Sequence, residues 1–209
     1  MDNTQKHKYT RIAIMGGTFD PIHYGHLATA ESVRCRYNAD KVFFIPSGCP
    51  PHKDINFVTN NERRYEMTLL ATKSNPNFEV SRIEIDRPGR TYTIDTITEL
   101  KEKYGSEVEI LFITGADVVH SIFTWKSWEK LLTLCDFVAA TRPGYKKSEM
   151  FKRIEYMREA YESKIHFIEV PALDISSSDI RERVSEGRTI KYLLPECVEE
   201  YIYENSLYK

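Results

Sequence analysis

The sequence predicts an α/β protein built on a doubly wound, Rossmann-like parallel sheet with helices on both faces. Two observations predict it. Short apolar runs, typical of buried parallel strands, alternate with segments of helical periodicity. Polar or glycine-containing clusters also follow five of these runs directly, as expected where ligands bind beyond the carboxyl ends of parallel strands.

The predicted elements follow one another without a dividing linker. The strands are expected at residues 11–15, 41–46, 78–85, 108–114, 136–141 and 165–170. The helices are expected at residues 23–37, 60–74, 93–104, 127–134, 147–161, 178–186 and 195–205. The second helix begins with the pattern of a capping box, Thr59-Asn60-Asn61-Glu62. We therefore expect a single domain over residues 11–209, preceded by a polar extension over residues 1–10.

Composition excludes several classes of protein. The chain has 209 residues, of which 41% are hydrophobic and 29% charged, as in ordinary globular proteins. Its net charge of −2 argues against a nucleic-acid partner, and no apolar stretch reaches the roughly 20 residues that span a bilayer. The four cysteines are far apart, which favours free thiols in a reducing cytoplasm over a disulfide framework. Homo-oligomer formation is left open.

The most informative segment is GGTFDPIHYGH, residues 16–26, which directly follows the first predicted strand. Gly16 and Gly17 are expected to let the chain turn sharply and bring backbone N–H groups close to a ligand. His23 and His26, three residues apart, share one face of a helix start. The segment therefore predicts a polyphosphate site at a helix N-terminus, with two imidazoles directed at it. The structural alternative is a glycine turn between strand and helix, with histidines in the core.

Other readings of this segment fit less well. No Gly-Lys-Ser/Thr follows, so it is not a Walker A loop, and it lacks the Gly-x-Gly-x-x-Gly dinucleotide fingerprint. His-x-x-His without an obvious third ligand is a weak zinc signal, so we expect no protein-held metal. Mg²⁺ is expected to arrive with the bound polyphosphate and to be held mainly by its phosphates and water.

Two motifs together resemble the nucleotidyltransferase superfamily whose hallmark is His-x-Gly-His, a HUP-type fold. The first is the string at residues 16–26. The second is ISSSDIR, residues 175–181, a serine-rich helix start that ends in arginine. Members of this superfamily transfer a nucleotidyl group from ATP or CTP to a phosphate-bearing acceptor. The resemblance implies that His26 touches the α-phosphate and His23 the phosphate chain. Gly16, Gly17, Thr18 and Phe19 would form the ATP loop.

Two further clusters suit the nucleotide from their own chemistry. Hydroxyls and N–H groups of Ser177 and Ser178 can bind β- and γ-phosphates, and Arg181 adds a forked donor about one turn on. The alternative is a plain cap, Ser176-x-x-Asp179. Gly115 and Asp117 follow the fourth strand and suit a nucleoside pocket, unless Asp117 only caps the next helix.

The acceptor side resembles the bacterial nicotinate-nucleotide adenylyltransferase branch. The segments that carry this resemblance are PPHK at residues 50–53, RTYTIDT at residues 90–96, and Trp125. It implies that Trp125 stacks on a pyridine ring, with Tyr92 nearby, and that Lys53 meets the mononucleotide phosphate. It also implies that backbone N–H groups near Thr93 and Lys126 hold the nicotinate carboxylate. Trp125 could instead belong to the core, although Trp128 is the better candidate for that role.

The resemblance implies a cytoplasmic enzyme that joins nicotinate mononucleotide to the AMP moiety of ATP, giving deamido-NAD and pyrophosphate. Its expected partners are these two small molecules, without nucleic acid or membrane. The alternatives are another adenylyltransferase, such as the phosphopantetheine enzyme, a cytidylyltransferase for a polyol or choline phosphate, or a catalytically silent nucleotide-binding protein.

Overall fold

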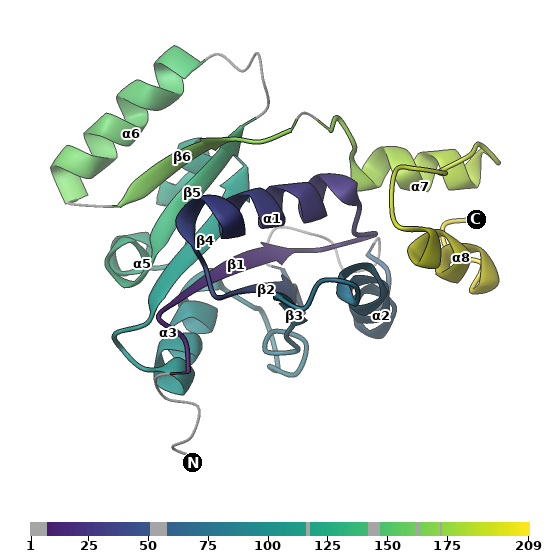
Figure 1. Cartoon of the computed structure of the whole chain (residues 1–209), viewed down its shortest axis with the longest axis horizontal. Helices are drawn as coiled ribbons and strands as arrows, with labels where there is room; N and C mark the ends of the chain where they lie inside the picture. The colour runs from purple at the N-terminus through teal and green to yellow at the C-terminus, as the bar shows by residue number, and fades with distance from the viewer. Residues whose placement is uncertain (1–7, 51–57, 116–117, 142–146, 162–163, 172) are drawn as a thin grey trace.

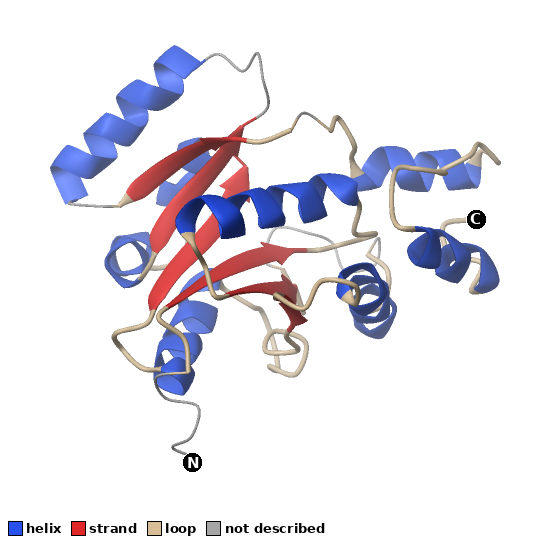
Figure 2. Ribbon diagram, viewed as in Figure 1, coloured by secondary structure: helices blue, strands red, loops and turns tan. Residues whose placement is uncertain are grey.

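The computed structural model describes residues 8–50, 58–115, 118–141, 147–161, 164–171 and 173–209. Its centre is a six-stranded sheet in the order β3-β2-β1-β4-β5-β6, and every neighbouring pair is parallel. The strands are β1 (Arg11–Gly17), β2 (Lys41–Pro46), β3 (Phe78–Val80), β4 (Glu109–Gly115), β5 (Asp136–Thr141) and β6 (Ile165–Glu169). This order is the doubly wound arrangement that the alternating pattern predicts. The predicted fold class is confirmed (Figure 2).

Helices cover both faces of the sheet (Figure 1). They are α1 (Tyr24–Tyr37), α2 (Asn61–Thr72), α3 (Thr93–Tyr104), α4 (Val118–Ser121), the 3-10 turn η3 (Ile122–Thr124), α5 (Trp128–Leu134), α6 (Lys147–Tyr161), α7 (Ser177–Ser185) and α8 (Glu196–Glu204). None of the described helices is long and apolar enough to cross a membrane.

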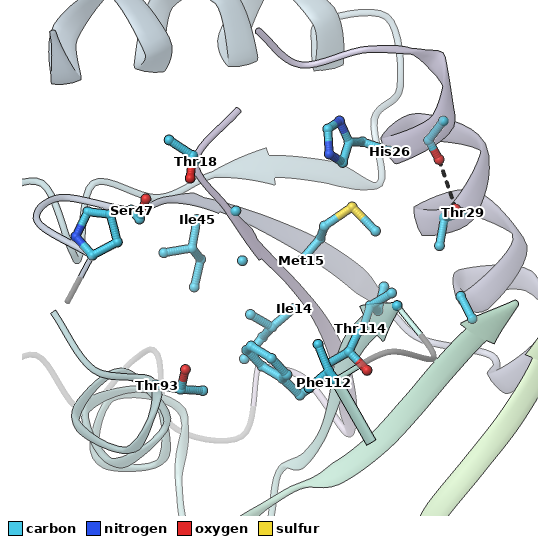
Figure 3. A pocket seen from close by; sticks show the side chains of 18 of the residues that line it. Ile14, Met15, Thr18, His26, Thr29, Ile45, Ser47, Thr93, Phe112 and Thr114 are labelled. Atoms are coloured by element: carbon cyan, nitrogen blue, oxygen red, sulfur yellow. Dashed lines mark hydrogen bonds between the residues drawn. The ribbon is translucent and has the colours of Figure 1, made fainter. Parts of the chain in front are cut away.

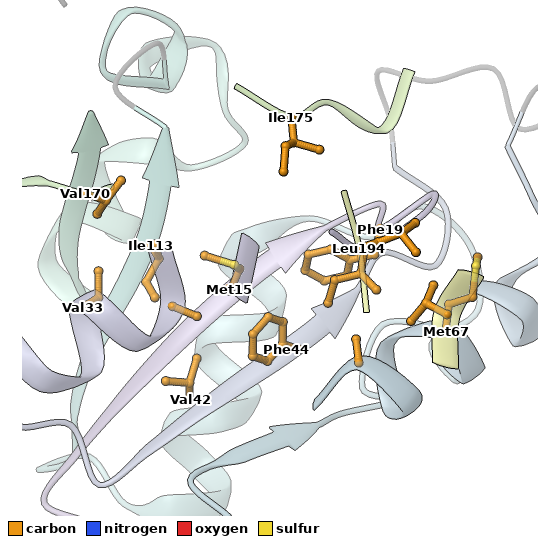
Figure 4. Close-up of a cluster of buried hydrophobic side chains, with 14 of the residues drawn as sticks. Met15, Phe19, Val33, Val42, Phe44, Met67, Ile113, Val170, Ile175 and Leu194 are labelled. Carbon is orange, nitrogen blue, oxygen red and sulfur yellow. The ribbon is translucent and has the colours of Figure 1, made fainter. Parts of the chain in front are cut away.

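Each central strand contributes to two hydrophobic cores because successive side chains point to opposite faces. In β1, Ile12 and Ile14 enter one core, whereas Ala13 and Met15 enter the other. The first core is closed by buried residues of α3, α5 and α6. The second is closed by α1, α2, α7 and α8, and several of its side chains are drawn in Figure 4. The apolar runs of the sequence are therefore continuous because both faces of the sheet are covered.

Two local predictions are wrong. The third strand ends at Val80 instead of residue 85, and turns follow in which Arg82 pairs with Asp86 and Glu62. The expected capping box from Thr59 is also absent. Asn60 caps α2 by accepting the Glu62 N–H at 2.8 Å, while the Glu62 carboxylate binds Arg82 at 2.7 Å. A tertiary ion pair thus takes the side chain that the local pattern assigns to the helix start.

The extension is not wholly separate from the domain. Residues 1–7 lie outside the described part, but Tyr9 packs edge-on against Phe43 and Tyr104, with ring centroids 6.0 and 5.4 Å away. The N–H of Thr10 donates to Asp40 at 2.8 Å. Tyr9 therefore packs on the first core, and Thr10 is hydrogen-bonded to the residue that precedes β2.

Candidate active site

A cavity of about 920 Å³ lies beyond the carboxyl ends of β1 and β4. This is the switch point of the sheet, because the chain leaves β1 for the second core through α1 but enters β4 from the first core through α3. Ile14, Ile45 and Phe112 form an apolar floor, and Thr18, His26 and Thr93 surround it (Figure 3). Gly16, Pro50, Gly115 and Ser176 also line the cavity, so four of the five predicted polar clusters reach it. The fifth, at residues 142–144, lies outside the described residues.

The two histidines of the motif lie together at the start of α1. His23 is the N-cap residue and is 6% exposed, and His26 occupies the third helical position. Their rings stack with centroids 3.8 Å apart and an angle of 27°, and both line the cavity. The reading of these residues as core histidines remote from a ligand site is therefore not supported.

His26 has a defined tautomer. Its Nδ1 accepts the backbone N–H of His23 at 3.3 Å, so the ring proton resides on Nε2. Burial, with a smaller effect of the neighbouring His23, lowers the pKa of His26 from 6.5 to about 3. At neutral pH the ring is therefore an uncharged donor held in one orientation, with the Phe19 ring edge-on at 5.1 Å.

The glycines act differently from the expectation. β1 continues through Gly16 and Gly17, and the residue in the left-handed region is Phe19, at φ 50°. A Cβ on Gly17 would lie 2.8 Å from the Phe19 ring, so glycine is required for close packing and not for a turn. A Cβ on Gly25 would lie 3.0 Å from Nδ1 of His23. Gly16, Gly17 and Thr18 line the cavity, whereas the Phe19 side chain is buried in the second core.

The serine motif forms both a cap and part of the cavity wall. The hydroxyl of Ser176 accepts the Asp179 N–H at 3.1 Å, as the plain-cap reading predicts. Ser177 and Ser178 line the cavity as the first two residues of α7, where N–H groups lack intrahelical acceptors. The Ser177 hydroxyl, however, donates to the Pro21 carbonyl at 2.8 Å. Its side chain therefore joins α7 to the loop after β1.

Arg181 occupies a different place from the one its motif suggests. Its Nη1 donates to the backbone carbonyl of Asp20 at 2.7 Å, and it is not among the residues that line the cavity. In this structure Arg181 holds the loop between β1 and α1. Its direct contact with a phosphate stays a prediction.

The two tryptophans have different surroundings. Trp125 lines the cavity and packs edge-on against Phe112 and Phe137, with centroids 6.0 and 6.4 Å away. Trp128 does not line it and lies between Phe123 and Tyr161, at 4.8 and 4.9 Å. Both tryptophans are partly buried against the first core, and only Trp125 also reaches the cavity.

The start of α3 faces the same part of the cavity as Trp125. Tyr92 is the N-cap and Thr93 the first helical residue, and both line the cavity together with Lys126. The Lys126 ammonium lies 4.5 Å from the Tyr92 ring centroid and 3.2 Å from Asp95 Oδ2. This end of the cavity therefore combines aromatic faces with the N–H groups of a helix start, which favour an anion.

Comparison with known proteins agrees with this geometry. The family model described as cytidylyltransferase-like matches residues 14–183. A probable nicotinate-nucleotide adenylyltransferase of Thermoanaerobacter sp. (strain X514) is 58% identical over 199 residues, covering 95% of this chain and 94% of the relative. The chain belongs to the nicotinate-nucleotide adenylyltransferase family.

Further similarities support the assignment to this family. A probable nicotinate-nucleotide adenylyltransferase of Corynebacterium glutamicum is 46% identical and covers 100% of this chain and 93% of its own length. The structure of Plasmodium falciparum nicotinic acid mononucleotide adenylyltransferase complexed with NaAD superimposes with a TM-score of 0.76. It covers 96% of this chain and 98% of the other, at 23% identity, so it shows that the fold is shared. The resemblance inferred from the motifs is confirmed.

Some residues that line the cavity do not belong to any of the sequence motifs. Glu84 lines the cavity and accepts the Thr96 hydroxyl at 2.8 Å, and burial raises the pKa of its carboxyl group. The sequence pattern assigns Glu84 to a strand and therefore does not indicate that it lines the cavity. Ser47 and Thr114, at strand ends, also line the cavity. Lys53 and Asp117 lie outside the described residues, so their predicted roles stay predictions.

The low pKa of His26 predicts that the ligand-free protein loses stability as the pH falls. The unfolded chain binds a proton at the ordinary pKa of 6.5, whereas folded His26 binds it only near pH 3. Between these values falling pH favours the unfolded chain, by up to about 1.4 kcal/mol per pH unit. The measurement is urea denaturation at about pH 6.5 and about pH 4.5. His26→Asn, whose amide oxygen can accept the His23 N–H, should lose less stability than the wild type. Equal losses would contradict the low pKa.

Proposed function

We propose that this protein transfers the adenylyl group of ATP to nicotinate mononucleotide, forming deamido-NAD and releasing pyrophosphate. The observation that carries the proposal is a single cavity with a phosphate-binding end at His23, His26 and Ser178 and an aromatic, anion-binding end at Trp125 and Thr93. Such a cavity can hold two nucleotides in line. Membership of the nicotinate-nucleotide adenylyltransferase family supports the same substrates.

The phosphate end supplies hydrogen-bond donors that are oriented before the substrate binds. His26 donates from Nε2, and the first N–H groups of α7 add donors with the partial positive charge of a helix N-terminus. These groups stabilise negative charge that develops on the α-phosphate in the transition state. Because the His26 ring is neutral and fixed, little reorganisation is needed during the reaction.

The reaction itself requires little covalent chemistry from the protein. A phosphate oxygen of nicotinate mononucleotide attacks the α-phosphorus of ATP, and the bond from that phosphorus to the pyrophosphate oxygen breaks. The attacking phosphate is already an anion, so no protein base has to remove a proton. Catalysis then depends on alignment of the two substrates and on charge stabilisation.

The acceptor end distinguishes the nicotinate ring by its shape and charge. The Trp125 indole offers a face to the flat pyridine ring, and Tyr92 lies at the adjoining helix start. The N–H groups near Thr93 and Lys126 bind the nicotinate carboxylate, which a helix N-terminus favours. Lys53 would meet the phosphate of the mononucleotide.

Magnesium enters as the complex with ATP. Among the described residues that line the cavity, the only carboxylate is Glu84, which is bound to Thr96 at the acceptor end. The donors at the phosphate end suit phosphate oxygens, and no described carboxylate lies there to bind Mg²⁺ as carboxylates commonly do.

The free thiols of all four cysteines support a reducing, cytoplasmic location.

The first test of the proposal is the choice of acceptor. Pyrophosphate release is measured with ATP and nicotinate mononucleotide, nicotinamide mononucleotide or phosphopantetheine. Nicotinate mononucleotide should exceed its amide in kcat/KM by on the order of 10²-fold, because two charge-assisted bonds are replaced by weaker or unpaired contacts. Equal use of both pyridine nucleotides would refute selection by paired N–H donors, and preference for phosphopantetheine would refute the proposed acceptor.

The second test removes the neutral donor of α1. His26→Ala should reduce kcat by roughly 10²–10³-fold, the typical effect of losing one oriented transition-state donor, while the protein remains folded. His166→Ala is the matched control. His166 lies on β6, where its ring binds Asp136 of β5 at 2.9 Å, and it does not line the cavity. Near-normal turnover of folded His26→Ala would remove this residue from the mechanism.

The third test compares the two tryptophans. Trp125→Ala should raise KM for nicotinate mononucleotide by up to about tenfold and leave KM for ATP unchanged, because only the stacked ring is lost. Trp128→Ala should instead cost about 3 kcal/mol of stability, or roughly 6–12 °C in Tm, with KM unaffected. The reverse pattern would place Trp128 at the acceptor and Trp125 in the core.

A further inference from the structure

A buried arginine holds the loop that follows β1. Arg64 of α2 is 0% exposed and does not line the cavity. Its Nη1 donates to the carbonyl of Thr18 at 2.6 Å, its Nη2 to the carbonyl of Ser47 at 2.6 Å, and its Nε to the carbonyl of Thr59 at 2.8 Å. One guanidinium therefore fixes three segments: the loop after β1, the end of β2 and the start of α2. The rigid fork of arginine suits this task.

A buried carboxylate holds the same loop two residues after Thr18. Asp20 is 4% exposed and does not line the cavity. Its Oδ1 accepts the hydroxyl of Tyr208 at 2.7 Å, and its Oδ2 accepts the Thr59 N–H at 3.1 Å. Burial and the nearby Asp20 raise the pKa of the Tyr208 phenol, so it keeps its proton and remains a donor. Burial lowers the pKa of Arg64, and the negative charge of Asp20 opposes this effect.

These contacts determine which backbone groups of the loop face the ligand. The carbonyl of Thr18 is occupied by Arg64, and the carbonyl of Gly17 accepts the Ser47 N–H at 2.8 Å. In a planar trans peptide the N–H points opposite to the carbonyl, so the N–H groups of Thr18 and Phe19 point away from these interior donors. Gly17 and Thr18 line the cavity, whereas Phe19 does not, so their occupied carbonyls leave the Thr18 N–H as a donor at the cavity wall.

The same contacts act on His26. The Phe19 ring, which follows Thr18 directly, packs edge-on against the His26 ring at 5.1 Å. Phe19 also has a left-handed backbone, which fixes the direction of its side chain. A shift of Thr18 or Asp20 would therefore move the support of the imidazole as well as the N–H groups of the loop.

We propose that Arg64, together with the Tyr208–Asp20 hydrogen bond, forms a positioning network for adenylyl transfer. The network touches neither substrate. It keeps the carbonyls of Gly17 and Thr18 turned inward. The Thr18 N–H and His26 can then bind the phosphates while the adenylyl group is transferred. The inference rests on the proposed function, because its effect is on the rate of that reaction.

The chain offers matched controls for both parts of the network. Arg64→Lys keeps the charge but removes the fork, and Arg63→Lys is its control, because the neighbouring Arg63 is exposed and donates to Tyr201 at 3.1 Å. Tyr208→Phe removes only the hydroxyl that reaches Asp20. Tyr201→Phe is its control, because it removes a similar hydroxyl that contacts Arg63 and not the loop.

The readout is kcat and KM for both substrates, measured by pyrophosphate release per folded protein, together with Tm. Arg64→Lys should lower kcat by on the order of 10–100-fold and Tyr208→Phe by about tenfold, because small displacements of aligned groups reduce rates strongly. Both KM values should stay within about threefold of wild type. Arg63→Lys and Tyr201→Phe should match wild type in kcat.

The outcomes separate the two proposals. If the wild type is active but Arg64→Lys and Tyr208→Phe lose only Tm and keep the kcat of their controls, the network is merely structural and the inference is overturned. If Arg64→Lys does not fold, Tyr208→Phe decides by the same criterion. A wild type that releases no pyrophosphate from ATP and nicotinate mononucleotide overturns the proposed function, and the inference with it.

Discussion

Parallel pairing of β1 with β2 on one side and β4 on the other is the constraint on which the rest of the structure depends. The registers place Gly17 beside Pro46 and Met15 beside Ile113, so the three strands end at nearly the same level. Because α1 and α3 lie on opposite faces, neither helix fills the space above this edge. The cavity is therefore a consequence of strand order, and the polar clusters gather there because they follow strand ends.

Burial gives the phosphate end its chemical character. Two imidazoles stacked 3.8 Å apart would repel each other as cations, but desolvation keeps His26 neutral, and its Nδ1 is occupied by a backbone N–H. The cavity thus offers oriented donors and helix N-termini for negative charge. Such groups need no counterion and lose little on reorganisation, which is what stabilisation of a phosphoryl transition state requires.

Two buried charged residues that do not line the cavity, Arg64 and Asp20, bind mainly to the backbone. Arg64 and Asp20 are buried, yet most of their partners are backbone groups and not opposite charges. A backbone carbonyl that binds an interior donor cannot turn toward the ligand. In this fold, buried charge orients the main chain at the edge of the cavity.

The sequence by itself determined the local elements and the chemical identity of the site. The residues of β2, β5 and α3 agree with their apolar periodicity, because period and propensity are properties of neighbouring residues. The sequence also identified the histidine and serine motifs, and His23, His26, Ser177 and Ser178 line one cavity. Only the tertiary structure decided that β3 stops at Val80, and that Glu84 lines the cavity.

Long-range contacts likewise decided how the motif residues are used. Arg181 binds the Asp20 carbonyl, 161 positions away, and Tyr208 reaches the Asp20 carboxylate across 188 positions. No local pattern encodes such partners, because each depends on how helices α7 and α8 pack against the edge of the sheet. The sequence therefore specified which groups the site contains, and tertiary packing specified their orientation, protonation and partners.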